Sequence, residues 1–289
     1  MEITVEVNVE ANSEEKAQKR LNQIDVMISG SNSMVKVITE LKKVSGNFKG
    51  EFSIDMEIKA PASMVLDLDN EFGDVVITEW DGPADISVEF GSLTANKFTS
   101  DQVSISLEFS KGSIGILNKA DIDIEYGDKF TLDKAKELDI SGEFSNVEIG
   151  TVERIIIDCE YGDFELDQAN QVDFEGEFTA FTLGKLYKRG EFRSEYGAIK
   201  IHFVSKSFEE LVLNNSFSGI KVYFEKGSSF DFDLSSEFGG ISIMSGANIK
   251  IDKEGIGEHV MKGSYGSGDN KSQVTAESEY GEITLKLAD

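Results

Sequence analysis

Cysteine, histidine and proline are scarce in this chain of 289 residues, and each shortage limits the structures and sites that the chain can form. Cys159 is the only cysteine, so no disulfide can form within the chain. His202 and His259 are the only histidines, and they are too far apart in sequence for a two-histidine metal motif. Two prolines beside 27 glycines suit an all-β chain with many bends.

Long apolar runs and basic residues are also lacking. No apolar run approaches the roughly 20 residues that span a bilayer, so we expect no membrane insertion of this chain. Its first residues alternate in polarity, whereas a signal peptide needs a basic start and an apolar run. Lys and Arg number 28 against 54 Asp and Glu, a formal net charge of −26. Because such an acidic surface repels phosphate backbones, nucleic acid is not an expected partner.

The most regular feature present is a repeat centred on a glutamate, an aromatic residue and a glycine or serine. Residues 121–128 show it most clearly, as Asp-Ile-Asp-Ile-Glu-Tyr-Gly-Asp, and between Phe72 and Tyr196 the aromatics recur every 17 to 19 residues. Self-similarity at this period predicts a solenoid. The aromatics are Phe72, Phe90, Phe109, Tyr126, Phe144, Tyr161, Phe178, Tyr196, Phe217, Phe238, Tyr265 and Tyr280.

Apolar residues keep a consistent register around most of the aromatics. They stand six and four residues before the aromatic or three and five after it, as Ile155, Ile157, Phe164 and Leu166 do around Tyr161. This parity predicts two inward-facing strands and a turn between the aromatic and the third residue after it. We also interpret the aromatics as inward-facing, stacked as an internal ladder, with a small residue two positions earlier leaving room for the rings. Cys159, at such a position, should be buried.

The predicted fold is mainly β, a single-stranded β-helix of about twelve rungs, right-handed, with a small N-terminal α+β cap. Tyr-Gly rungs alternate with Phe-Ser or Phe-Thr rungs, which would also fit a coil of about 35 residues holding two corners; one corner per coil is the preferred interpretation. Wider spacings after Phe217 indicate insertions, and residues 263–270 are typical of a loop or an irregular end.

Residues 1–62 do not carry the repeat and are predicted to form the capping region, with residues 63–289 as the repeat domain. A first strand should be followed by a helix that Asn12 caps, with Glu15 completing a capping box. A hairpin over residues 26–38 and a strand over residues 52–58 should follow. An exposed solenoid end leaves an open edge and an open core, which explains the need for a cap.

Glutamate directly precedes the aromatic in ten of the twelve repeats, and its parity points it outward. The functional hypothesis is a rail for divalent cations, calcium above all, or for a cationic ligand; the candidates are Glu125, Glu143, Glu160 and Glu177. The alternative is a solvated face whose glutamates accept hydrogen bonds from corner amides and prevent rods from pairing edge to edge. The absence of the nonapeptide repeat of calcium-binding solenoids favours the alternative. The ten glutamates are Glu71, Glu89, Glu108, Glu125, Glu143, Glu160, Glu177, Glu195, Glu237 and Glu279.

Signatures of catalysis are missing. The sequence has no nucleophile elbow, phosphate-binding loop or dinucleotide fingerprint, and carboxylate pairs on so acidic a chain discriminate nothing. Trp80 fits either a sugar-stacking platform or a packed residue, and packing is the favoured reading. We therefore expect a protein that is not an enzyme.

The repeats resemble a known family. The alternation of Glu-Tyr-Gly-Asp with Glu-Phe-Ser-Asn, the segment 66–75 that follows Pro61, and the N-terminal residues 5–7 and 12–17 are similar to the adhesin-like β-solenoid domains of Bacteroidetes cell envelopes. The likeness covers nearly the whole chain, but no site residue is established for that family. It implies an exported envelope or surface protein whose secretion signal has been removed from the sequence.

These observations predict a non-enzymatic adhesin or interaction scaffold that presents an extended face to a protein or glycan partner, as a monomer. One alternative is a β-helix that binds or acts on polysaccharide, which would need a cleft of long loops and clustered carboxylates. Another is a scaffold that polymerises end to end, which the predicted cap disfavours.

Overall fold

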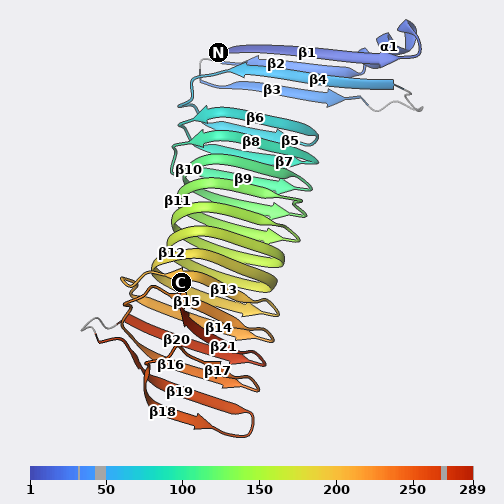
Figure 1. The fold of residues 1–289 in the computed structure, drawn as a ribbon. Helices are drawn as coiled ribbons and strands as arrows, with labels where there is room; N and C mark the ends of the chain where they lie inside the picture. The colour runs from blue at the N-terminus through green and yellow to red at the C-terminus, as the bar shows by residue number, and fades with distance from the viewer. Residues whose placement is uncertain (32, 43–49, 268–271, 289) are drawn as a thin grey trace. The chain divides into compact units, whose positions relative to one another are not determined.

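The computed structural model describes residues 1–31, 33–42, 50–267 and 272–288. It is mainly β, with 73% of the residues in strands and 3% in helix. The chain divides into two compact units, Met1–Pro61 and Ala62–Asp289. The second unit is a β-solenoid of about nine turns, which confirms the predicted fold class (Figure 1).

The first unit has the predicted order of a strand, a helix and three strands. Its elements are β1 (Glu2–Ala11), α1 (Glu14–Leu21), β2 (Ile24–Gly30), β3 (Val35–Leu41) and β4 (Gly50–Lys59). Strands β1 and β4 pair antiparallel, and so do β2 and β3, the predicted hairpin. None of the described residues of this unit is buried. Its predicted capping function concerns the relation between the units and stays a prediction.

The helix cap differs from the prediction. Ser13, not Asn12, is the N-cap: its backbone is extended and its hydroxyl accepts the Lys16 amide at 3.4 Å. Because α1 begins at Glu14, the third residue after the cap is Lys16, which cannot complete a capping box. Glu14 and Glu15 instead place negative charge in the first turn, where the helix dipole favours it.

The solenoid unit consists of short strands joined at corners and of longer ones that wind continuously through them; β12 runs through more than two coils. Their bounds are β5 (Leu66–Asn70), β6 (Gly73–Trp80), β7 (Ala84–Glu89), β8 (Gly91–Phe98), β9 (Val103–Glu108), β10 (Lys111–Glu125), β11 (Phe130–Glu143), β12 (Val147–Glu195), β13 (Ile199–Val204), β14 (Glu210–Ser216), β15 (Ile220–Phe224), β16 (Phe230–Glu237), β17 (Ile241–Ser242), β18 (Asn248–Glu254), β19 (Glu258–Tyr265), β20 (Ser272–Glu279) and β21 (Ile283–Leu287).

Neighbouring coils pair in parallel, one repeat apart. Ile140 in β11 lies opposite Ile122 in β10 and Ile157 in β12, which are 18 residues before it and 17 residues after it. A coil therefore holds one Glu-aromatic corner, and the preferred one-corner interpretation is confirmed.

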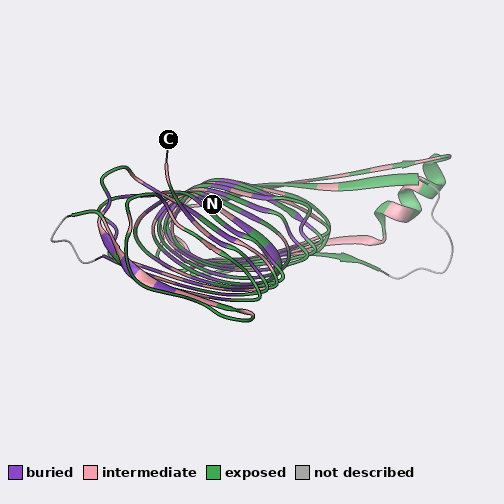
Figure 2. Cartoon of the chain, turned by 60° about the horizontal axis from the view of Figure 1, so that its bottom comes forward, coloured by how far each residue is buried: buried purple, intermediate pink, exposed green. Residues whose placement is uncertain are grey.

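The core runs along the inside of the coils. Residues six and four positions before the aromatic, and three and five after it, are buried as predicted around most of the aromatics; around Phe144 these are Leu138, Ile140, Val147 and Ile149. Around Phe72 the same positions are only partly buried, and Lys129, the third residue after Tyr126, is exposed. Figure 2 shows the resulting alternation of buried and exposed residues along each coil. Cys159 is buried as predicted, and burial, the largest cause, raises the pKa of its thiol to about 12, so the thiolate that would react is suppressed.

The aromatic rings themselves lie outside, so the prediction of an internal ladder is wrong. Phe144 and Tyr161 leave 49% and 43% of their surface exposed. Both adopt left-handed backbone conformations, with φ of 50° and 55°. This geometry acts as a bulge that turns two consecutive residues, the glutamate and the aromatic, to the same outer side. The inward alternation resumes at the next residue, two positions before the third residue after the aromatic, where the sequence pattern placed it.

Small buried hydroxyl groups close the inner side of the corners. The Ser145 hydroxyl accepts the Gly127 amide at 2.9 Å and lies within hydrogen-bonding distance of the carbonyl oxygens of Glu143 and Ile124, at 2.8 and 3.3 Å. One serine thus serves its own corner and the corner before it. This sharing explains why Tyr-Gly coils alternate with Phe-Ser coils without requiring a coil of double length.

The last segments do not stack in sequence order. The ring of Phe217 stacks on Tyr280, and Tyr280 stacks on Phe238, while Tyr265 contacts Phe230 instead. Coils therefore stack in sequence order only as far as Phe217. The solenoid has about nine turns, not the predicted twelve. Residues 263–265, predicted as loop, belong to β19; residues 268–270 of that predicted loop lie outside the described residues.

A methyl group added at a corner glycine should lower the stability of the fold markedly. A Cβ atom at Gly162 would lie 2.0 Å from the carbonyl oxygen of Ser145, a backbone atom that cannot move without shifting the preceding coil. We expect Gly162→Ala to lower the free energy of unfolding by about 3 kcal/mol, measured by urea denaturation. Gly240→Ala is the matched control, because Gly240 is exposed and nothing lies within 4 Å of its Cβ position. Equal losses in the two variants would contradict this packing at the corner.

Candidate functional site

Eleven aromatic rings form a continuous stack on the outside of the solenoid, here called the aromatic rail. Successive centroids are 4.5–5.6 Å apart and successive planes differ by 1–14°. In order, the rings are those of Phe72, Phe90, Phe109, Tyr126, Phe144, Tyr161, Phe178, Tyr196, Phe217, Tyr280 and Phe238.

Stacking determines which part of each ring faces solvent. Rings within the rail are 43–51% exposed, whereas the terminal Phe72 and Phe238 are 67% and 64% exposed. The difference is what one uncovered ring face would add at each end. Within the rail both faces of a ring are covered by its neighbours, so a partner would meet ring edges.

The residues of the aromatic rail adopt a left-handed backbone conformation that residues with bulky side chains rarely adopt. Ten of its eleven residues have φ between 47° and 62°. Glycine and asparagine tolerate this region best, and another residue costs on the order of 1 kcal/mol there. An offset-stacked ring pair contributes about 0.5–1.5 kcal/mol, so stacking on two neighbours offsets the strain. The chain accordingly holds exposed rings where a turn alone would favour Gly or Asn.

The ten glutamates that precede these aromatics form a second line, here called the glutamate column. The register places Glu125 opposite Glu108 and Glu143, and Glu143 opposite Glu160, so successive members lie about 4.8 Å apart. Glu125, Glu143, Glu160 and Glu177 are all exposed, which confirms their predicted outward direction. Ser216 takes this position between Glu195 and Glu279.

Among the described residues, no carboxylate of the glutamate column forms an ion pair or a side-chain hydrogen bond. Basic side chains of the solenoid instead pair with other acids: Lys129 with Glu148 at 2.7 Å, and Lys206 with Glu225 at 3.6 Å. Stacked carboxylates repel by about 1 kcal/mol per pair in water. The column is therefore a line of uncompensated negative charge, and the predicted hydrogen bonds from corner amides are not formed in the described part of the chain.

The cation hypothesis for this column stays a prediction. Within the residues that the structure describes, no three His, Cys, Asp or Glu side chains come together as a metal site. Adjacent members of the column belong to different coils and point outward in parallel. Their arrangement suits a linear cationic ligand better than a single coordinated ion.

A smaller group of aspartates lies on the strands before the corner. Partial burial of its carboxyl group, followed by the negative charges of Asp121, Asp123 and Asp158, raises the pKa of Asp139, while Lys119 opposes the rise. Asp139 lies directly opposite Asp121 in the parallel register. The folded state therefore disfavours the charged form of this carboxyl group.

Neutralising Asp139 should stabilise the protein in a pH-dependent way. A raised pKa in the folded state penalises folding once the carboxyl group ionises, so the penalty is complete above the folded pKa and absent well below the ordinary value of 3.8. We expect Asp139→Asn to raise Tm at pH 7 by on the order of 1 °C and to leave it unchanged near pH 3. Thermal unfolding followed by circular dichroism measures this, with Asp167→Asn as the control at an exposed position. A gain that persists at pH 3 would refute the electrostatic cause.

The remaining candidate residues have structural roles. The indole of Trp80 packs against the core and donates a hydrogen bond to the Met64 carbonyl at 2.9 Å, as the packing interpretation expected. His202 is exposed beside Tyr223, and partial burial, followed by the charge of Lys200, lowers its pKa. The ring of His259 contacts Asp252 at 2.9 Å.

Two depressions on the surface of the solenoid are shallow and open. One lies beside the glutamate column where Ser216 interrupts it, and Glu177, Arg193, Glu195 and Asn215 also line it. The other lies over the strands that contain Lys200 and Lys221. Neither forms an enclosed cleft.

The sequence pattern predicts the glutamate column correctly but places the aromatic rail on the wrong side of the coil. A signal was available: small polar residues such as Ser110, Ser145 and Thr179 follow the aromatic at a position that proves to be buried. Inward residues on both sides of a Glu-aromatic pair leave only the outside for both members of the pair.

Comparisons with protein-family models, with curated proteins and with solved structures each found no match for this chain. Within the described residues, no helix has the length and hydropathy needed to cross a membrane.

Proposed function

We propose that this protein is a non-enzymatic interaction scaffold, an adhesin-like rod of the cell envelope, and that it binds an extended cationic partner along the aromatic rail and the glutamate column. The observation that carries the proposal is the uncompensated column of carboxylates beside a continuous apolar edge. The envelope location rests on the family resemblance of the repeats.

The aromatic rail and the glutamate column together indicate which chemical groups a partner should carry. Carboxylates spaced about 4.8 Å apart attract a chain that carries many positive charges, since each charge pair adds attraction and releases counterions. Ring edges offer apolar contact but little cation–π attraction, because cations favour ring faces. A partner with both cationic and apolar side chains therefore matches this surface best, for example an extended Lys- or Arg-rich polypeptide segment.

The polysaccharide alternative fits this geometry less well. Sugars stack on the faces of aromatic rings, and in the rail those faces are covered except at Phe72 and Phe238. An enzyme acting on polysaccharide would also need a cleft with opposed carboxylates. The shallow depressions described above support a binding role over a catalytic one.

Binding of a cationic polymer tests the proposal. Fluorescein-labelled poly-L-lysine of about 20 residues is titrated with the protein at two salt concentrations and followed by anisotropy. We expect Glu125→Gln, Glu143→Gln, Glu160→Gln and Glu177→Gln, combined in one chain, to weaken binding at least about tenfold, because four aligned charges are lost. Weaker binding at higher salt is expected for both proteins.

The matched control removes four exposed charges from other positions: Asp133→Asn, Glu153→Gln, Glu165→Gln and Asp167→Asn. It changes the net charge equally, so we expect less than about a twofold loss from the long-range field. Equal losses in both variants, or no binding of poly-lysine by the parent, would contradict the proposal. Loss of binding in millimolar calcium at constant ionic strength would assign the column to a divalent ion instead.

A further inference from the structure

The coil formed by residues 272–287, here called the inserted coil, occupies a layer that its place in the sequence does not give it. Strand β20 pairs in parallel with both β14 and β16, and β21 pairs in parallel with both β15 and β17. Figure 1 shows these last strands between the coils of β14–β15 and β16–β17, which are consecutive in the sequence. The inserted coil, which comes last in the sequence, thus lies between two coils that are consecutive in the sequence.

The inserted coil is bonded on both sides. On one side the amide of Phe217 donates to the Glu279 carbonyl at 2.7 Å; on the other the amide of Tyr280 donates to the Glu237 carbonyl at 2.8 Å. Its inward side chains complete the core: Val274, Ala276, Ile283 and Leu285 are at most 1% exposed. The same segment therefore supplies hydrogen bonds, core packing and one ring of the aromatic rail.

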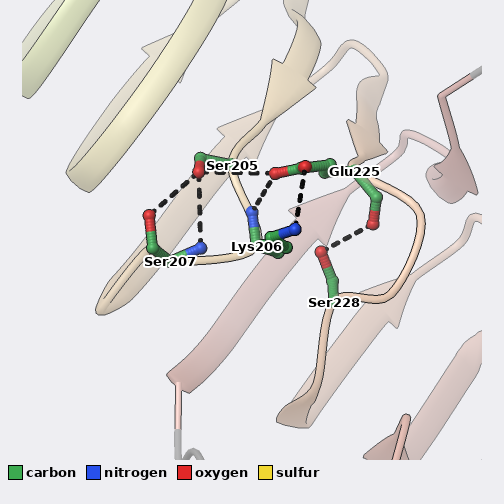
Figure 3. A network of polar contacts seen from close by, with 5 residues as sticks. All are labelled: Ser205, Lys206, Ser207, Glu225 and Ser228. Atoms are coloured by element: carbon green, nitrogen blue, oxygen red, sulfur yellow. Dashed lines mark hydrogen bonds and ion pairs between the residues drawn. The ribbon is translucent and has the colours of Figure 1, made fainter.

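A polar network holds the crossover that makes room for this coil. The chain passes from β15 to β16 through residues 225–229 and skips one layer there. In Figure 3 the Glu225 carboxylate accepts the Lys206 amide at 2.8 Å and pairs with the Lys206 ammonium, while Ser228 donates to the Glu225 carbonyl at 2.7 Å. These contacts do not involve the inserted coil, so the network of Lys206, Glu225 and Ser228 holds the crossover without it.

The order of the chain requires an open slot. Strands β16 and β18 each pair antiparallel with β19, and all three precede β20 in the sequence. Without residues 272–287, β14–β15 and β16–β17 would present two facing strand edges about 9.6 Å apart, lined by apolar residues such as Leu213 and Leu234. Unpaired edges of this kind capture any strand that fits them.

We infer that the slot between β14–β15 and β16–β17 is a strand-acceptor site, and that its second occupant is the inserted coil of another copy of this chain. The same segment from a second copy makes every hydrogen bond and core contact that the first makes, so exchange costs little beyond association. Attachment to its own chain gives the inserted coil an effective concentration in the millimolar range. Exchange of the inserted coil between two chains therefore competes with closure within one chain when the chains refold together at concentrations near the millimolar range.

Cysteine pairs placed on two different full-length chains test this inference. Val212 and Thr275 are direct partners in the β14–β20 register and face outward, with Cα atoms about 4.8 Å apart, within disulfide range. One chain carries Val212→Cys and the other, with a distinguishing tag, carries Thr275→Cys. They are refolded together from urea at about 0.5 mM and oxidised, and the products are separated on a non-reducing gel.

We expect a disulfide-linked heterodimer after joint refolding, at least about ten times more abundant than after mixing the separately folded chains. A single chain with both substitutions should close to a monomeric disulfide at low concentration, which verifies the geometry. Pairing Val212→Cys with Glu277→Cys, two residues out of register, should give no more than background. Closure of the single chain without any heterodimer would overturn the inference.

A second measurement uses the unmodified protein in case the cysteine variants fold poorly. The full chain is refolded at about 1 μM and at about 0.5 mM and passed through size exclusion with light scattering. The inference expects a dimer that forms only at the higher concentration and retains the circular dichroism spectrum of the monomer. Monomer alone at both concentrations would overturn it.

Discussion

Replacing Phe174 by aspartate is expected to lower the free energy of unfolding by more than about 5 kcal/mol and to unfold the adjoining coils. The Phe174 ring is fully buried and contacts the Phe181 ring at 4.3 Å between centroids, so the variant would place a carboxylate in a dry core. Urea denaturation followed by circular dichroism measures the loss.

Phe178→Asp is the matched control, four residues along the same strand. Its ring is 44% exposed in the aromatic rail between Tyr161 and Tyr196, and aspartate tolerates positive φ better than most residues. We expect a loss of about 1–2 kcal/mol, from lost stacking and from a new charge beside the glutamate column. An internal ladder, as the sequence pattern suggested, would instead make Phe178→Asp as damaging as Phe174→Asp.

Ala276→Asp in the inserted coil is expected to cost more than about 4 kcal/mol and to affect one end of the solenoid selectively. Ala276 is fully buried between Leu213 of β14 and Leu234 of β16. A charge there should expel the inserted coil and expose the edges on both sides. Because each coil contacts only its neighbours, the coils from β5 to β13 should remain folded.

Limited proteolysis with mass spectrometry, together with calorimetry, separates these outcomes. Cleavage should begin after β13, and thermal unfolding should split into two transitions. Thr275→Asp is the control, because Thr275 lies in the same strand but faces outward and is half-buried. A single transition at the parent Tm would show that the inserted coil contributes nothing to this end of the rod, and loss of the whole rod in one step would contradict nearest-neighbour coupling.

The two surface lines place different demands on the chain. The aromatic rail combines strained backbone with stacking that offsets it, so it can be retained for stability alone. The glutamate column has no such compensation among the described residues, since its carboxylates repel one another and have no partner. A surface that destabilises its own fold is better evidence for binding than one that stabilises it, which is why the proposed function rests first on the glutamates.

The amino-acid pattern specifies the solenoid, its period and most of the inward residues. Alternation with a period of two specifies which side chains face the core wherever the backbone is extended, and this held for Ile140 and Val147 on either side of a corner. The same alternation placed Glu143 outside. It failed at Phe144, because a left-handed residue breaks the alternation and its conformation is set by the corner's hydrogen bonds, not by the hydropathy of its neighbours.

The order of the last coils depends on contacts between distant segments of the chain. Every coil presents nearly the same edge of amides and carbonyls and the same apolar interior, so local pattern does not say which coil stacks on which. The crossover after Phe224 skips one layer, and β16 pairs antiparallel with β19 on its other side. The space left between β14–β15 and β16–β17 is filled by residues 272–287, whose Tyr280 ring stacks between Phe217 and Phe238. These are contacts between segments distant in sequence, and for that reason the repeat alone could not reveal them.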